Sequence, residues 1–162
     1  MNRLGRALAA GLLLPVLLLA GQALATTPGV SPVEDLAALG ERARHGRMPI
    51  LLVVSRDDCP YCKLLKREIL EPMLLSGDYS GRVLIRELLV DSYGPVRDFD
   101  GETVSSDAVA SRYGARLTPT VLFLDHRGRE LAEPMIGVNT VEFYGYYLDA
   151  AIDAARVRLG AD

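Results

Sequence analysis

The chain has 162 residues, of which 49% are hydrophobic and 24% charged, a balance that suits one folded globular domain and excludes a disordered chain. Its net charge of −3 argues against a nucleic-acid partner, because phosphates bind a basic face. Only two cysteines are present, separated by two residues.

The N-terminus has the pattern of a secretory signal peptide. Arg3 and Arg6 provide a basic start. The stretch from Leu8 to Ala20 carries no charge, and Ala23-Leu24-Ala25 gives the small-x-small cleavage pattern. The apolar stretch is short for a membrane span, which needs roughly 20 residues. We expect cleavage after Ala25 and a periplasmic mature protein; the alternative is an uncleaved anchor in the inner membrane.

The mature chain, residues 26–162, keeps 16 basic and 21 acidic residues, a net charge of −5, and is expected to form one domain. Its first helix is predicted from Ser31-Pro32-Val33-Glu34, a capping box with proline at the first helical position, to about Arg44, with Gly46 as its stop. Residues 48–55, MPILLVVS, are a charge-free run of strand length, which predicts a strand buried on both faces.

A helix is predicted directly after this strand, beginning at Pro60. Leu65, Ile69 and Met73 recur every four residues, as one buried helix face requires. Pro72 is expected to kink or end the helix, because proline lacks the N–H group and its ring clashes with the preceding turn.

The middle of the chain predicts a strand, a loop and a short helix. The strand is RVLIRELLV at 82–90, and the long loop at 91–105 has turn chemistry. The short helix at 106–113 ends at Gly114, a plausible left-handed cap.

The C-terminal part predicts two strands and a helix. TPTVLFLD at 118–125 leads through a tight turn into RELAEPMI at 129–136, and Asn139-Thr140-Val141-Glu142 caps the last helix. The apolar side of that helix is expected to hold Phe143, Tyr147, Ala151, Ile152 and Ala155. This order of elements predicts an α/β domain with a central sheet covered by helices.

The stretch RDDCPYCKLLKRE, residues 56–68, contains Cys59 and Cys62, and three interpretations of the pair compete. A zinc site needs four nearby ligands, but only His45 and His126 could join the cysteines, and neither has a ligand spacing to them. A structural disulfide that closes so short a loop would stabilise little on the chain-entropy model. The position of the pair favours a redox couple.

Cys59 is expected at the N-cap of the helix, with Pro60 at the first helical position. Unpaired backbone N–H groups and the helix dipole stabilise a thiolate there, and the thiolate is the form that attacks disulfides. Cys62, one turn later and less exposed, can then attack the mixed disulfide and release the reduced product. Cys59 and Cys62 are therefore the candidate catalytic residues.

These residues resemble the thioredoxin fold: a strand, Cys-Pro-Tyr-Cys and a helix, followed far downstream by Thr118-Pro119 at the start of a strand. The resemblance spans roughly residues 31–159. It implies a central mixed sheet flanked by helices, an extra N-terminal helix, and a cis peptide bond before Pro119, facing the cysteines. It makes Thr118 and Pro119 substrate-binding residues, with Pro60 and Tyr61 as further candidates.

The segment 87–125 looks most like secreted single-domain thioredoxins, including those associated with bacterial sulfur oxidation. This resemblance implies a monomeric thiol-disulfide oxidoreductase without cofactor or metal. Its partners would be protein disulfides and an electron donor in the membrane or periplasm. The chain departs from the family in two places: Asp58 stands where thioredoxins carry tryptophan, and Val53 where they bury an aspartate as base for the resolving thiol. No dimerisation domain accompanies the motif, so the isomerase architecture is incomplete.

The direction of electron flow depends on the charges around Cys59. The helix N-terminus stabilises the thiolate and makes the couple more oxidising. Asp57 and Asp58 oppose the thiolate by like-charge repulsion, and Arg56 offsets only part of this. We expect a reductase or exchange protein. The alternatives are a disulfide-forming oxidant and a non-catalytic binding or assembly protein on the same scaffold.

Overall fold

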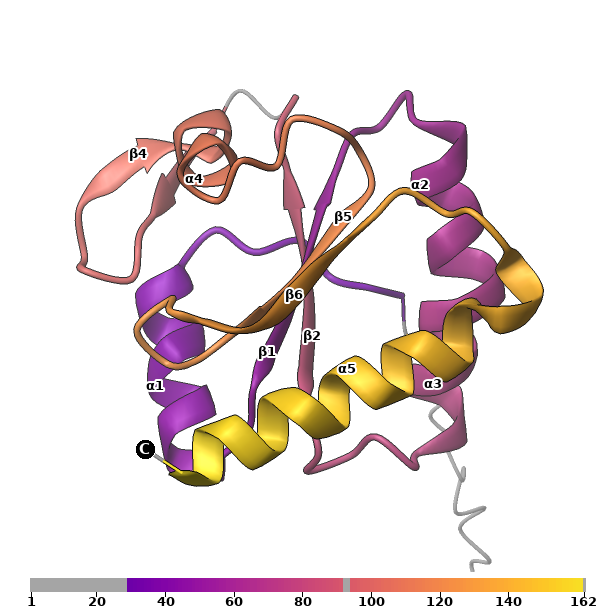
Figure 1. The fold of residues 1–162 in the computed structure, drawn as a ribbon. Helices are drawn as coiled ribbons and strands as arrows, with labels where there is room; N and C mark the ends of the chain where they lie inside the picture. The colour runs from indigo at the N-terminus through magenta and orange to yellow at the C-terminus, as the bar shows by residue number, and fades with distance from the viewer. Residues whose placement is uncertain (1–28, 92–93, 162) are drawn as a thin grey trace, which may run out of the picture.

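The structure is a computed structural model, and it describes residues 29–91 and 94–161 (Figure 1). The expected signal peptide at residues 1–25 lies outside the described residues. Within the described ranges, no helix has both the length and the apolar character that crossing a membrane requires.

A four-stranded mixed sheet forms the centre of the domain, in the order β2-β1-β5-β6. Strand β1 (Ile50–Ser55) runs parallel to β2 (Leu84–Leu89) and antiparallel to β5 (Thr120–Leu124). Strand β6 (Glu130–Ile136) pairs antiparallel with β5 at the other edge. Every residue of β1 is buried, as the charge-free run at 48–55 predicts.

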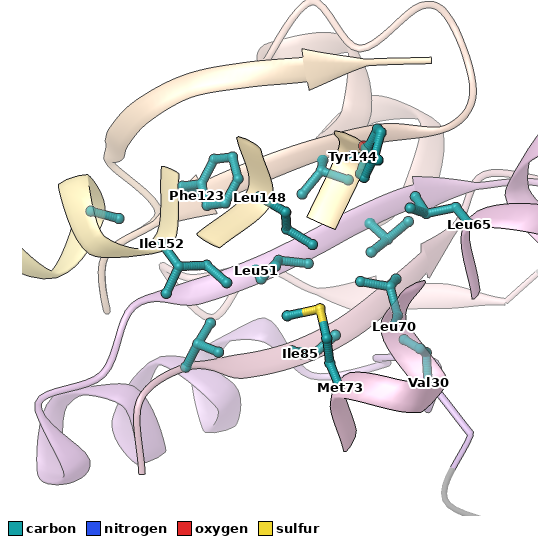
Figure 2. Packing of buried hydrophobic residues seen from close by; sticks show 14 of the residues in the cluster. Val30, Leu51, Leu65, Leu70, Met73, Ile85, Phe123, Tyr144, Leu148 and Ile152 are labelled. Atoms are coloured by element: carbon teal, nitrogen blue, oxygen red, sulfur yellow. The ribbon is translucent and has the colours of Figure 1, made fainter. Parts of the chain in front are cut away.

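Helices cover both faces of this sheet. Helices α1 (Leu36–Gly46) and α4 (Ser106–Arg112) pack against one face, and Figure 1 shows them on the opposite side of the central strands from α2. The other face carries the helices that follow the cysteines together with α5 (Val141–Ala161). Figure 2 shows Leu51 and Phe123 of the sheet among residues from these helices. The predicted fold class, including the extra N-terminal helix, is confirmed.

The N-terminal segment departs from the sequence prediction. Helix α1 begins at Leu36, with the Asp35 carboxylate accepting a 2.7 Å hydrogen bond from the Ala38 N–H, so the predicted capping box at 31–34 is wrong. Residues 31–33 instead lie along the edge of β2, where the Val33 N–H donates to the Glu87 carbonyl at 2.8 Å. Backbone hydrogen bonds to an open strand edge outweigh the local helix signal.

The helical segment after the cysteines does not end at Pro72. It consists of α2 (Pro60–Leu65), a π-helical turn η1 (Lys66–Leu70) and α3 (Glu71–Ser76). The Glu71 N–H donates to the Lys66 carbonyl, five residues back, so the turn just before Pro72 is wider than an α-helical turn. This wider turn accommodates the proline ring, and the helix continues to Ser76.

The predicted loop at 91–105 contains a small hairpin that the sequence prediction missed. Strands β3 (Pro95–Arg97) and β4 (Thr103–Ser105) pair with each other in a separate two-stranded sheet. Between them the buried Asp98 forms an ion pair with Arg112 of α4. Residues 92–93 lie outside the described ranges.

Helix α5 is correctly predicted, and its buried side is correct only in part: Ile152 and Ala155 are buried as expected, whereas Phe143 and Tyr147 are not. Tyr144, Leu148, Ile152 and Ala155 are buried in the core, where Figure 2 shows the first three. Phe143 and Tyr147, which the prediction placed inside, are both 61% exposed. The predicted and the observed sets both recur at helical spacing, so periodicity alone does not choose between them.

Candidate active site

The two cysteines lie where strand β1 gives way to α2. Cys59 is the N-cap of α2 and Pro60 occupies its first turn, as predicted from the sequence. The Cys62 N–H donates a 3.1 Å hydrogen bond to the Cys59 sulfur. A sulfur atom thus takes the place that a Ser or Asp oxygen takes in an ordinary N-cap, and it faces the positive end of the helix.

Cys59 and Cys62 form a disulfide, with their Cα atoms 5.2 Å apart. Cys59 is 8% exposed, whereas Cys62 is completely buried. An incoming sulfur atom can therefore reach Cys59 but not Cys62. This asymmetry is the one that a two-step exchange needs, with an outer attacking sulfur and an inner resolving one.

The Thr118–Pro119 peptide bond is cis, which confirms the assignment made by family resemblance. The Cys59 sulfur lies 3.5 Å from the Thr118 carbonyl oxygen, so the fold brings together residues 59 positions apart. On the far side of Pro119, its carbonyl accepts a 2.8 Å hydrogen bond from the Gly137 N–H at the end of β6. The disulfide thus lies against the residue before the cis-proline, and the cis-proline is in turn hydrogen-bonded to the residue that follows β6.

Apolar side chains surround this junction. Of the candidates for substrate contact, Pro60 and Tyr61 are exposed in the first turn of α2, and Tyr61 is 59% exposed. Two further exposed apolar side chains flank the cis-proline, and the sequence interpretation missed them. Leu117 precedes Thr118 and is 66% exposed, and Ile136 precedes Gly137 and is 54% exposed.

Carboxylates gather on the approach to Cys59. Asp57 and Asp58 are exposed, and Asp58 lies 3.5 Å from Arg56. The Asp57 N–H donates a 2.8 Å hydrogen bond to the carboxylate of Asp91, just beyond β2. Sequence reasoning missed Asp91, although β1 and β2 are parallel, so the residues that follow them share one edge of the sheet.

A buried ion pair lies beneath the helix that carries the cysteines. Lys66 Nζ is 2.7 Å from Glu87 Oε1, and Glu87 is only 3% exposed in β2. Glu87 is the register partner of Val53, the position at which thioredoxins bury an aspartate. The sequence carried one signal of this pair, a glutamate beside Arg86 within a strand whose other residues are leucine and isoleucine.

Metal ligation finds no support in the part of the chain that the structure describes. Within it, no three or more His, Cys, Asp or Glu side chains are grouped so that they could hold a metal ion. Each cysteine is bonded to the other, and His45 lies 2.7 Å from the Glu41 carbonyl oxygen on its own helix.

Comparison with known proteins agrees with this geometry. The family model of the thioredoxin-like domain matches residues 35–151. Oxidised thioredoxin O2 from Arabidopsis thaliana is a similar solved structure, with 17% identity, a TM-score of 0.50 and coverage of 76% of this chain and 95% of that chain. Oxidised mitochondrial thioredoxin 3 from Saccharomyces cerevisiae gives 16% identity, a TM-score of 0.51 and coverage of 76% and 93%.

Among curated proteins, no sequence matches significantly. The two solved structures, at this level of identity, show the fold. The family match covers most of the chain, and the Cys59–Cys62 disulfide fits the CXXC motif. The chain therefore belongs to the thioredoxin-like domain family.

Proposed function

We propose that this protein is a periplasmic thiol-disulfide oxidoreductase that reduces or exchanges disulfides of other proteins. The observation that carries the proposal is the Cys59–Cys62 disulfide at the N-terminus of α2, with its outer sulfur against the cis Thr118–Pro119 peptide. The signal-peptide pattern, ending at Ala25, supports export.

The exchange begins with the reduced protein. The Cys59 thiolate, stabilised by the Cys62 N–H and the helix N-terminus, attacks one sulfur of a substrate disulfide. A mixed disulfide forms, and the first substrate thiolate leaves and takes up a proton. Cys62 then loses its proton and attacks the Cys59 sulfur, which releases the second substrate thiol. Two electrons pass from the protein to the substrate, and the protein is left with the Cys59–Cys62 disulfide.

The substrate in this scheme is an extended polypeptide that carries a disulfide. Thr118 and Pro119 would align it beside Cys59, and the exposed Tyr61, Leu117 and Ile136 would offer apolar contacts. A small thiol compound would cover only part of this surface. The geometry therefore favours protein disulfides over small-molecule disulfides as substrates.

The carboxylates near Cys59 support the reducing direction. Asp57, Asp58 and Asp91 oppose the thiolate, which makes the reduced protein less stable and a better electron donor. A reductase in an oxidising compartment needs electrons, so a membrane or periplasmic donor completes the proposal. More specifically, we propose that the protein works as a monomer and is related to the thioredoxins of bacterial sulfur oxidation.

The first test compares wild type with Cys59→Ser in the reduction of insulin by dithiothreitol. We expect the mature wild-type protein to accelerate insulin precipitation and Cys59→Ser to match the protein-free rate. Equal behaviour of the two proteins would favour a non-catalytic binding or assembly role.

The second test measures the reduction potential against glutathione by thiol trapping. A potential lower than roughly −180 mV would support the reductase, and one near about −120 mV would indicate an oxidant instead.

A further inference from the structure

The Lys66–Glu87 pair is the one strong charge interaction buried beneath the redox helix among the residues described. The two side chains are 22% and 4% exposed, and their charged atoms are 2.7 Å apart. Around Glu87 the structure supplies little other compensation for its charge. Its strand partner Val53 is apolar, and the hydrogen bonds that residues 31 and 33 make with Glu87 join main-chain groups.

Stability alone is a weak reason for such a pair. Removing two charges from water costs several kcal/mol per ion in real proteins, and well-packed apolar residues often do as well or better. A chain of this length can also bury a sizeable apolar core without it. A buried pair of this kind therefore invites an explanation in terms of the groups nearest to it.

The reactive side chain that shares a helical face with Lys66 is that of Cys62. Lys66 follows it by four residues, and the Lys66 N–H donates to the Cys62 carbonyl, so the two side chains lie on one helical face. Residues so spaced have their Cβ atoms about 5–6 Å apart. Cys62 has no solvent exposure, so water screens the charges of the neighbouring pair only weakly at its sulfur.

We propose that the Lys66–Glu87 pair sets the ionisation of the Cys62 thiol in the reduced protein, and with it the ease of the resolving step. Lys66 stabilises the Cys62 thiolate, and Glu87 opposes that thiolate while holding Lys66 in place. Both are positioning residues, because they act through Cys62. The role in the resolving step rests on the proposed function, but the effect of the two charges on the ionisation of Cys62 can be measured without substrate.

Other titratable groups packed around this helix do not mask the effect. Helix α5 presents Tyr144, and burial raises the pKa of its hydroxyl to about 12, so the tyrosine stays neutral near neutral pH. Strand β1 presents Val53, which does not titrate. Asp57, Asp58 and Asp91 lie on the outer side, near Cys59.

The direct test uses a Cys59→Ser background, in which Cys62 is the only thiol of the chain. The NMR chemical shift of the Cys62 Cβ, followed across pH, gives the pH at which the thiol is half ionised and needs no reagent to reach the buried sulfur. Glu87→Gln should lower this pH by about one unit, because it removes an opposing charge and leaves Lys66 unpaired. Lys66→Met should raise it by about the same amount. The double variant should return close to the starting value.

Lys63→Met is the matched control. It removes the same charge from the same helix, one residue after Cys62, but on the exposed surface. Solvent screening should keep its effect to a small fraction of the Lys66 effect. Opposite shifts for Glu87→Gln and Lys66→Met would support the proposal. Shifts in the same direction, or no larger than that of Lys63→Met, would overturn it, and melting curves of each variant identify any that fail to fold.

The same variants, with Cys59 restored, test the consequence for redox chemistry. The potentials should coincide at about pH 6, where the Cys62 thiol is protonated in every variant, and diverge at about pH 10, above the ordinary cysteine pKa of about 8.5. There Glu87→Gln should be more oxidising than wild type and Lys66→Met more reducing, each by up to about tenfold in the glutathione equilibrium, or ~30 mV. Coincident potentials at both pH values would overturn the link to reducing power. A wild type that exchanges with no disulfide would overturn the proposed function, even if the shifts in Cys62 ionisation hold.

Discussion

The two sulfur atoms of the disulfide lie in opposite surroundings. Cys59 opens onto an exposed rim of carboxylates and apolar side chains, and its neighbours Asp57 and Asp58 are in contact with water. Cys62 is buried, and the nearest charges along its helix face belong to a pair held inside the domain. Charges of the same kind should therefore act weakly on the outer sulfur and strongly on the inner one.

This difference suits the two steps of exchange. The outer sulfur must meet many partners, so its reactivity depends on a helix N-terminus and on a surface that solvent can reach. The inner sulfur reacts only with Cys59, so buried groups with fixed positions can determine its reactivity. Substitutions around Cys59 should therefore affect the attack on the substrate, and substitutions around Cys62 should affect the release of the product.

The largest expected effect separates the roles of the two sulfurs. Cys62→Ser should still attack substrate disulfides through Cys59 but should not release the product, so mixed disulfides with insulin chains should accumulate. Non-reducing gel electrophoresis and mass spectrometry would detect them. Cys59→Ser is the control and should form none. Mixed disulfides formed through Cys62 in that control would contradict the assignment of the outer and inner sulfurs.

Substitutions in the buried Lys66–Glu87 pair should also change the free energy of unfolding more than substitutions at the surface. Lys66→Met leaves Glu87 buried without its partner, and we expect a loss of about 2 kcal/mol in the free energy of unfolding, measured with urea at neutral pH. Combining Lys66→Met with Glu87→Leu should recover most of it.

An exposed ion pair on the same helical segment provides the control for that experiment. Arg67 and Glu68 are 2.7 Å apart, with side chains 68% and 45% exposed. Arg67→Met should cost less than about 0.5 kcal/mol. A cost equal to that of Lys66→Met would show that burial does not distinguish the two pairs.

Much of the outer environment could be predicted from sequence, because its signals are local. The charge-free run before Cys59 predicts β1, and Cys59-Pro60 predicts the N-cap and first turn of α2. The Thr118-Pro119 pair needed the family resemblance as well, since proline at a strand start is ordinary on its own. Each of these depends on residues adjacent in the chain.

The inner environment could not be predicted in this way. Lys66 and Glu87 meet only because the register of β1 and β2 places Glu87 beside Val53 and beneath the helix, and no local pattern encodes that register. The other errors have the same origin. Residues 31–33 follow the edge of β2 instead of starting a helix, and α5 buries Tyr144 instead of Phe143 because of how it packs on the sheet.

A smaller effect is expected from the apolar rim. Leu117→Ser should lower kcat/KM for insulin about fivefold, because partial burial of one leucine against a polypeptide contributes ~1 kcal/mol. Reduction of oxidised glutathione, which is too small to cover the rim, should be unaffected. Leu75→Ser is a matched control, since Leu75 is 60% exposed at the other end of the helical segment, in α3. Equal losses for the two variants would contradict a substrate contact at Leu117.

The smallest expected effect concerns the carboxylates near Cys59, tested in a Cys62→Ser background. Asp57→Asn should speed alkylation of Cys59 at about pH 6 by no more than about twofold at low salt, because Asp57 is exposed. The gain should vanish at about 1 M salt, where the screening length falls to about 3 Å. Asp91→Asn keeps an acceptor for the Asp57 N–H, and Asp91 is only partly exposed, so its gain should persist in salt. If high salt abolished the rate increase in both variants, Asp91 would act on Cys59 as an exposed charge does. Only Cys62 would then be affected by buried charges.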